Sequence, residues 1–262
     1  MLKHLNIDVS KVKEIILKAK EHAYKETSIE PEPKLTTKIN WPVNCDVNPG
    51  LEGAIACETK IGYINGQKGW LVYQGYNIFD LCAHSTFEEV SYLLLHGNLP
   101  NKKQLRDFKN KLLRYRYMPD TLRRLMNFPI EDMNSMMALR LGTNLMRQKG
   151  ISRSKEINRT QRSCMFAGDE ECENTIENCY QLIAGLSTIT AALARLKTGR
   201  LPIEPREDLS HAGNLLYMIN GEAPSEIEER IMDVCLILHA DHGLNASTFA
   251  ALVVASTLSD LY

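Results

Sequence analysis

The sequence lacks a strong excess of charge of either sign. Its 262 residues include 31 Lys and Arg against 32 Asp and Glu, which leaves a formal net charge of -1 at pH 7. A protein that binds nucleic acid or an acidic membrane surface usually carries a clear basic excess. We therefore expect no nucleic-acid partner and no membrane partner.

The cysteines lack the spacing of a zinc site or a disulfide framework. There are seven of them, an odd number, and no Cys-x-x-Cys pair occurs. Cys172 and Cys179 are the closest two, and their spacing matches no zinc template. The simplest interpretation is a reducing compartment, so we expect a cytoplasmic protein. No uncharged stretch is long enough to cross a membrane, and the charged N-terminus does not resemble a secretory signal.

The chain also lacks a Gly-rich dinucleotide motif, a Walker loop and an internal repeat. What remains is an ordinary globular composition, with 44% hydrophobic and 24% charged residues. Residues 51–78 carry short apolar runs around Asn65-Gly66, a strong hairpin signal. From residue 77 onward the apolar residues follow helical spacing. The sequence therefore predicts a mainly α protein with a small N-terminal β-hairpin element.

Individual helices are predicted from capping residues and apolar periodicity. A surface helix is expected over 8–25, and heavily apolar helices over 133–146, 176–196 and 249–262. Capping signals begin helices near Thr86, near Asn101, at Asp208 or Ser210, and near Ser225, and glycines end two of them at Gly97 and Gly221. Residues 26–50 are predicted to be an extended connector, and 147–173 a mobile polar loop.

One polar segment stands out between two apolar runs, from His239-Ala240-Asp241-His242-Gly243 to Asn245-Ala246-Ser247. A helix continued from Ser225 to His242 would place His239 and His242 three positions apart on one face. Three interpretations compete. The histidines could bind a metal, they could be buried structural groups, or an imidazole could face an anionic substrate that Asn245 and Ser247 help to orient.

This segment closely resembles the oxaloacetate-binding segment of citrate synthases and 2-methylcitrate synthases, and the run from Val253 to Tyr262 continues the likeness. Further family-like blocks are Gly50-Leu51-Glu52-Gly53, Tyr73-Gln74-Gly75-Tyr76-Asn77-Ile78, His84 to Pro100 and Pro205 to Ala212. The resemblance covers residues 50–262. It implies a partial citrate synthase-like helical large domain over 50–262, preceded by an N-terminal helix and extended arm over 1–49.

The resemblance also implies roles for four residues. His242 would be the catalytic histidine, which binds oxaloacetate by donating a hydrogen bond to its carbonyl oxygen. Asn245 and Ser247 would orient the neighbouring groups of the substrate site. His239 is a further substrate-binding candidate, whose alternative is a helix-packing role. His84 and His211 match family positions that we interpret as structural, and Gln74 replaces an Arg that many relatives carry.

The implied reaction condenses acetyl-CoA with oxaloacetate to give citrate and CoA, a step of the tricarboxylic acid cycle. No metal or other cofactor is implied, since acetyl-CoA is a substrate, and a homodimer built on the apolar helices is expected. The Gly-Pro-x-His-Gly-Gly-Ala-Asn-type motif of the family, with its second catalytic histidine, is not present. We therefore expect a partial sequence that is inactive by itself.

Three alternatives remain open. A 2-methylcitrate synthase would use propionyl-CoA, a helical module could dimerise without catalysis, and a metal-dependent hydrolase could use His239 and His242. The apolar helices could equally be ordinary core helices.

Overall fold

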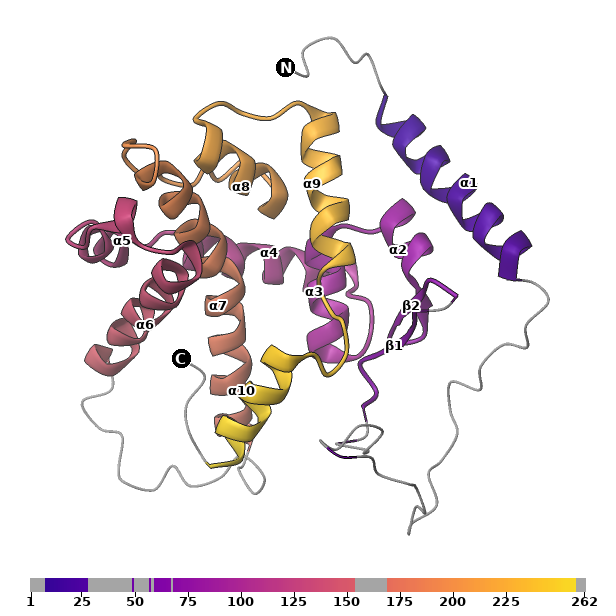
Figure 1. The fold of residues 1–262 in the computed structure, drawn as a ribbon, viewed down its shortest axis with the longest axis horizontal. Helices are drawn as coiled ribbons and strands as arrows, with labels where there is room; N and C mark the ends of the chain where they lie inside the picture. Colours follow the sequence, from indigo (N-terminus) through magenta and orange to yellow (C-terminus); the bar gives the residue numbers. More distant parts are fainter. Residues whose placement is uncertain are drawn as a thin grey trace.

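The computed structural model of the chain describes residues 8–27, 49, 57, 59–66, 68–153 and 169–257. Most of these residues lie in α-helices (Figure 1). The helices are α1 (Val9–Thr27), α2 (Ile78–His84), α3 (Phe87–His96), α4 (Lys102–Arg116), α5 (Pro119–Leu125), the 3-10 turn η2 (Ile130–Asp132), α6 (Ser135–Arg153), α7 (Asp169–Leu196), α8 (His211–Asn220), α9 (Glu226–Leu238) and α10 (Ala246–Ser256). The prediction of a mainly α protein is confirmed.

A small antiparallel sheet precedes α2. Its strands β1 (Gly62–Asn65), β2 (Trp70–Tyr73) and β3 (Tyr76–Asn77) lie in sequence order. Asn65 pairs with Trp70, so the predicted hairpin is present with a four-residue connection. The next turn has two central residues, Gln74 and Gly75, with φ of 48° and 87°. Positive φ at both positions is the geometry of a tight hairpin turn that matches strand twist.

The helix ends follow the capping signals in the sequence. Three capping boxes form, in which an N-cap side chain and the side chain three residues later satisfy each other's backbone N–H: Thr86 with Glu89, Asn101 with Gln104, and Ser225 with Glu228. Gly97 and Gly221 end α3 and α8 in the left-handed conformation that glycine tolerates best. These ends are decided within a few residues, which is why local sequence predicts them.

Helix α7 is the centre of the helical part. It packs against α4, α6 and α8, and its side chains fill the core shared with α5 and α6. Among the described residues, only 176–196 form a helix that is long and apolar enough to cross a membrane. A single helix of this kind is weak evidence for a membrane span, because core helices of globular proteins meet the same requirements. Because α7 contacts three other helices and 56% of that window is buried, we interpret it as a core helix.

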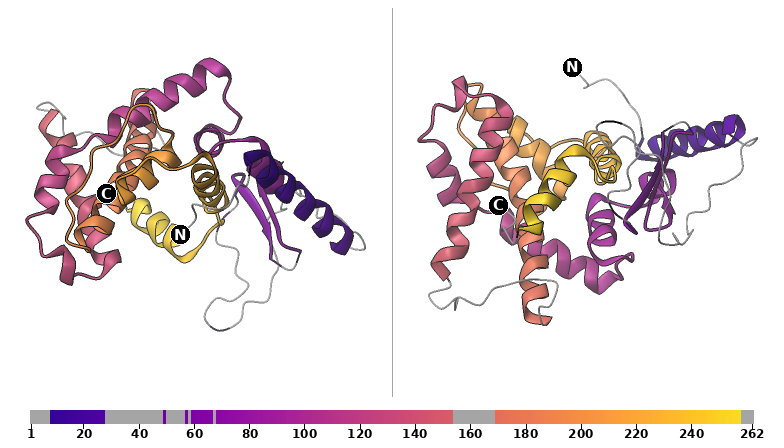
Figure 2. Two further views of the ribbon diagram at one scale, coloured as in Figure 1. Left: turned by 90° about the horizontal axis from the view of Figure 1, so that it is seen from above. Right: turned by 60° about the horizontal axis from the view of Figure 1, so that its bottom comes forward.

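Helix α9 connects the helical part to the sheet. It packs against α8 on one side and against α2 and α3 on the other. Buried side chains from β2, α2, α3 and α9 form one hydrophobic cluster that includes Tyr73, Leu81, Val90 and Ile237. Helix α1 packs on α2, so α1 and the sheet lie at the opposite end of the molecule from α5 and α6 (Figures 1 and 2).

Two predictions about connections differ from the structure. The polar stretch 147–173 is helical at both ends, where α6 continues to Arg153 and α7 begins at Asp169, so the predicted loop is wrong there. Acidic residues favour the N-terminus of a helix, and residues 169–172 include three of them. Residues 154–168 and almost all of the predicted connector 26–50 lie outside the described residues. The division of the chain at residue 49 stays a prediction.

Gly142 permits a close contact between α6 and α7. A Cβ atom on Gly142 would lie 2.5 Å from Cγ2 of Ile189, which is buried in the core. Gly142→Val should therefore lower the free energy of unfolding by about 1–3 kcal/mol through overpacking. Chemical denaturation would measure it, with Gly66→Val as the control because a Cβ there meets nothing within 4 Å. An equal loss in an Ile189→Ala background would contradict this explanation.

Candidate functional site

The predicted site residues lie at the corner between α9 and α10 (Figure 1). Helix α9 ends at Leu238, and His239 is its C-cap with φ -102° and ψ 4°. The helix therefore does not continue to His242 as the spacing predicted, and the two histidines do not share a helical face. Gly243, at φ 64°, turns the chain before α10 begins.

His239 contacts the last turn of its own helix. Its ring Nδ1 lies 2.7 Å from the carbonyl oxygen of Cys235, and the side chain is exposed. Because a carbonyl can only accept, Nδ1 carries the hydrogen and donates it. This contact is what a histidine that caps a helix makes. The predicted substrate-binding role of His239 is not tested by it.

His242 projects from the corner as an exposed side chain. Its neighbour Asp241 is half-buried, and the Asp241 carboxylate accepts a hydrogen bond of 3.2 Å from the Gly243 backbone N–H. Gly62 of β1 lies directly against this carboxylate, because a Cβ there would be 2.6 Å from Asp241 Oδ2. The imidazole is thus free to meet a ligand, while the residue before it is packed against the sheet.

Tyr73, at the end of β2, holds the backbone of this corner. Its side chain is fully buried, and its hydroxyl lies 3.0 Å from the carbonyl oxygens of Ile237 and Asp241 and 3.3 Å from that of Leu238. The Asp241 N–H also points at the same hydroxyl, at 3.2 Å. One side chain from the sheet therefore contacts both backbone polar groups of Asp241, the residue before His242.

Asn245 and Ser247 lie at the start of α10. Asn245 is the N-cap, and its side-chain oxygen accepts a hydrogen bond of 2.9 Å from the Thr248 N–H. Ser247 is exposed in the first turn. Both residues are exposed on the same corner as His242, which they follow closely in the sequence. Their predicted orienting roles stay predictions, since the observed Asn245 contact belongs to the helix cap.

The corner does not assemble a metal-ligand set from the described residues. Across those residues, no group of three or more His, Cys, Asp and Glu side chains comes together in a way that could hold a metal ion. His239 and His242 therefore have no third ligand in that part of the chain, and nothing in the geometry favours the metal-dependent hydrolase.

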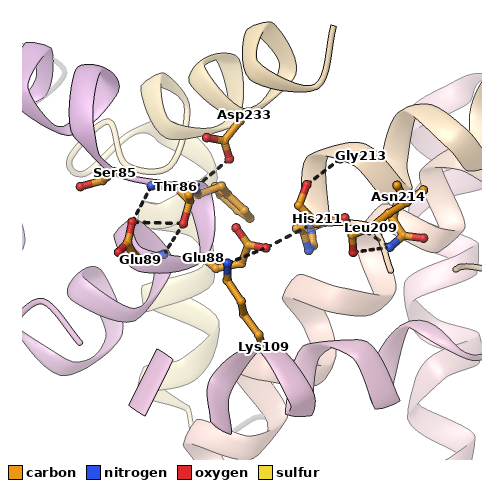
Figure 3. Close-up of polar contacts among 12 residues, drawn as sticks. Ser85, Thr86, Glu88, Glu89, Lys109, Leu209, His211, Gly213, Asn214 and Asp233 are labelled. Carbon is orange, nitrogen blue, oxygen red and sulfur yellow. Dashed lines mark hydrogen bonds and ion pairs between the residues drawn. The ribbon is translucent and has the colours of Figure 1, made fainter. Parts of the chain in front are cut away.

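A second polar cluster is buried between α3, α4 and α8 (Figure 3). Glu88 is only 2% exposed, and its Oε1 accepts a hydrogen bond of 3.1 Å from the backbone N–H of His211. Arg116, 3% exposed, lies with Nη2 3.1 Å from Nδ1 of His211. Lys109 of α4 is 4.0 Å from the same Glu88 oxygen. The cluster ties three helices together and confirms that His211 is a buried structural histidine in this fold.

A third group fixes α9 against α2 and α3. Arg230 donates to the Ser85 carbonyl at 2.8 Å and to Asp233 Oδ2 at 2.6 Å, and it also contacts the Cys82 carbonyl. The other Asp233 oxygen accepts the Phe87 N–H at 2.8 Å, at the start of α3. These bonds position the helix whose C-terminal end leads into the corner.

His211 gives the fold a definite pH dependence. Burial, and then the charge of Arg116, lower the pKa of His211 to about 3. Its unfolded pKa is about 6.5, so between these values only the unfolded chain binds the proton. The contribution of His211 to stability is complete above pH 6.5 and is lost as the pH falls toward 3, by up to about 1.4 kcal/mol per pH unit.

The test compares unfolding free energies of the wild type and His211→Gln between pH 7 and pH 4. The difference between the two proteins should shrink steadily below pH 6.5. Burial raises the pKa of Asp233 to about 6. Asp233 therefore changes stability in the opposite direction, but it is present in both proteins and cancels in the difference. A difference that stays constant with pH would contradict the assignment.

Sequence reasoning missed Tyr73 and Gly62 as parts of the site. Both are separated from the corner by more than 160 positions, and both read locally as ordinary strand residues. The one local signal was Tyr73 at the end of an apolar run, next to Gln74-Gly75. Such a run predicts a strand but does not predict which distant loop the hydroxyl reaches.

The chain matches a known protein family and several of its members. The family described as citrate synthase, C-terminal domain, matches residues 50–262. A citrate synthase from Haloferax volcanii is 40% identical over 218 residues, which are 83% of this chain and 55% of that protein. A Bacillus subtilis protein named citrate/2-methylcitrate synthase is 34% identical over 82% of this chain and 54% of its own length. The chain spans about half the length of the curated relatives it matches.

Solved structures agree with these relatives. A citrate synthase from Pyrobaculum aerophilum superposes with a TM-score of 0.71 at 38% identity, covering 87% of this chain and 56% of that one. A Thermoplasma acidophilum citrate synthase, solved as a ternary complex with carboxymethyl coenzyme A and oxaloacetate, has a TM-score of 0.69 at 28% identity. It covers 83% of this chain and 53% of its own.

Proposed function

Because this chain belongs to the citrate synthase family, we propose that the protein condenses acetyl-CoA with oxaloacetate to give citrate and CoA, as in the tricarboxylic acid cycle. The observation that carries this proposal is the family match over residues 50–262, which includes the exposed His242 at a corner held by the sheet. The Thermoplasma relative, solved with oxaloacetate and a coenzyme A derivative, supports the two substrate classes.

The proposed reaction has two steps, a condensation and a thioester hydrolysis. The methyl group of acetyl-CoA loses a proton, and its carbon forms a bond to the ketone carbon of oxaloacetate, whose oxygen becomes an alkoxide and is then protonated. Water next cleaves the thioester, which releases CoA and citrate. The His242 imidazole would donate a hydrogen bond to the ketone oxygen, and this bond strengthens as negative charge develops there.

The test measures CoA release by the intact protein with acetyl-CoA and oxaloacetate together. Thiol production that requires both substrates, with citrate identified as the product, is the expected result. Omitting oxaloacetate is the control for simple thioester hydrolysis. Binding of oxaloacetate without turnover would overturn the proposal and favour a non-catalytic helical module.

A second candidate substrate is propionyl-CoA, which would give 2-methylcitrate. The observation that favours it is the Bacillus subtilis relative, whose name includes both products. The ratio of kcat/KM for the two acyl-CoA substrates decides between them. A higher value for propionyl-CoA would replace the primary assignment while leaving the role of His242 unchanged.

The proposed assembly is a homodimer. Helix α10 has no buried residue, and its apolar side chains Phe249, Leu252, Val253 and Val254 are each about half exposed. An exposed apolar helix face is costly in water, and a second copy could cover it. Sedimentation should give twice the chain mass, and Leu252→Glu should shift it toward the monomer. A monomeric wild-type protein would contradict the proposal.

The proposed location is the cytoplasm. Cys57, Cys82, Cys179 and Cys235, the cysteines in the described part of the chain, are free thiols, which suits a reducing compartment. Fractionation of native cells should recover the protein with a cytoplasmic marker enzyme. Recovery with an oxidising compartment would overturn this location.

A further inference from the structure

The Tyr73 hydroxyl meets four backbone groups of the α9–α10 corner. This hydroxyl carries one proton, yet it faces the carbonyl oxygens of Ile237, Leu238 and Asp241 within 3.3 Å. It can donate to one carbonyl at a time, and it can accept the Asp241 N–H. Burial raises the pKa of Tyr73, so the hydroxyl keeps the proton it needs as a donor.

The bonds to Asp241 determine where His242 lies. The Asp241 N–H and C=O both point at the hydroxyl, so the two peptide units that flank the Asp241 Cα, including the one that leads into His242, are held by the same side chain. The Asp241 carboxylate is fixed independently, because it accepts the Gly243 N–H and packs against Gly62. The residue immediately before the proposed catalytic imidazole is thus held by β1 and β2.

Within the described residues, helix α10 does not supply this constraint from the other side. No residue between Leu244 and Thr257 is buried, and every one of them is exposed. In the described chain, the corner is therefore held only through α9 and the sheet. The small sheet contributes few residues to the hydrophobic core, but it holds the corner through Tyr73 and Gly62.

We propose that Tyr73 is a positioning residue, which places His242 for the oxaloacetate ketone by holding both backbone polar groups of Asp241. The inference rests on the proposed function of His242. It adds that the N-terminal sheet, more than 160 residues away in sequence, sets the precision of the site. A displacement of about 1 Å at a catalytic group can lower a rate by roughly 100-fold.

The first test is Tyr73→Phe in the intact protein. We expect kcat/KM for oxaloacetate to fall roughly 10- to 100-fold, while KM for acetyl-CoA stays unchanged. Tyr76→Phe is the matched control, because Tyr76 lies on the neighbouring strand β3 and is 42% exposed. Ile78→Val is the control for stability, since Ile78 belongs to the same hydrophobic cluster but makes no contact with the corner's backbone polar groups. A Tyr73→Phe protein that loses thermal stability but behaves kinetically like Ile78→Val overturns the inference.

A second variant tests the same claim without altering the tyrosine. In Gly62→Ala, the new Cβ would lie 2.6 Å from Asp241 Oδ2, so the Asp241 carboxylate has to move and loses its place beside the Gly243 N–H. We expect the same selective loss with oxaloacetate. An unchanged kcat/KM in a folded Gly62→Ala protein counts against the inference, and this variant decides the question if Tyr73→Phe does not fold.

Nuclear magnetic resonance separates this inference from the proposed function. The His242 ring signals of the ligand-free protein should shift in Tyr73→Phe and keep their positions in Tyr76→Phe. This readout requires no catalysis. If His242→Ala leaves oxaloacetate kinetics unchanged, the proposed function of His242 fails; if the ring signals do not move in Tyr73→Phe, the positioning inference fails on its own.

Discussion

Replacing His242 with alanine in the intact protein should lower kcat/KM for oxaloacetate by roughly 100- to 1,000-fold, the usual effect of removing one preorganised donor to a developing oxyanion. The fold should survive, because the His242 side chain is exposed and forms no hydrogen bond with another described residue. Steady-state kinetics with varied oxaloacetate measures the loss, and circular dichroism with thermal unfolding confirms the fold.

Two further variants make this result specific. His242→Gln retains an N–H donor and should recover part of the lost rate. His84→Ala is the matched control, because His84 is an exposed histidine at the end of α2, outside the corner. Wild-type kinetics in His242→Ala would remove His242 from the reaction, whatever the effects of the other two changes.

The sequence predicted those parts of the fold that depend on neighbouring residues. The capping box at Ser225 and Glu228, and the glycine that ends α8, are decided within one helical turn, so their patterns are sufficient. The hairpin at Asn65 is equally local. The resemblance to a known family then indicated which corner carries the chemistry, which periodicity alone could not decide.

The end of α9 could not be predicted in this way. Apolar spacing continues through His239, and no Gly or Pro lies between Leu238 and His242. The helix nevertheless stops at Leu238, because the carbonyl oxygens of its last turn bond to side chains. The Tyr73 hydroxyl contacts two of these oxygens, and the His239 ring contacts a third. One of these partners comes from a strand far earlier in the chain. A helix whose end is decided by tertiary contacts looks locally like a helix that continues.

The same limit applies to the two adjacent carboxylates Glu88 and Glu89. The sequence treats them alike, and both stand in the first turn of α3. Glu89 closes the capping box, as predicted, whereas Glu88 points into the protein toward His211 (Figure 3). Burying a charge is tolerated only where other helices supply partners, and those partners are 21 and 123 positions away at Lys109 and His211.

Arg116 yields the largest stability effect we expect. Its charge favours the buried Glu88 carboxylate, and burial lowers the pKa of Arg116 while Glu88 opposes that change. Neither group is fully satisfied, because Glu88 Oε2 and Arg116 Nε have no hydrogen-bond partner. Arg116→Leu would remove this charge and the contact with His211 Nδ1, and would leave Lys109, 4.0 Å from Glu88 Oε1, as the cation beside the carboxylate. We expect a loss of about 3 kcal/mol or more in the free energy of unfolding, because buried polar and charged groups are left short of partners.

The double variant Glu88→Gln with Arg116→Leu distinguishes charge from packing. A neutral amide is cheaper to bury than a carboxylate that has lost a nearby positive charge, so the double variant should be more stable than Arg116→Leu alone. Arg123→Leu is the matched control on α5, where the ion pair with Asp120 is solvent-exposed; it should change stability by no more than about 0.5 kcal/mol. If Arg116→Leu were as mild as Arg123→Leu, or if adding Glu88→Gln made it worse, the buried charges would not hold α3, α4 and α8 together. The position of α9 beside them would then depend on its apolar contacts and on other polar contacts, such as those of Arg230, Asp233 and Tyr73.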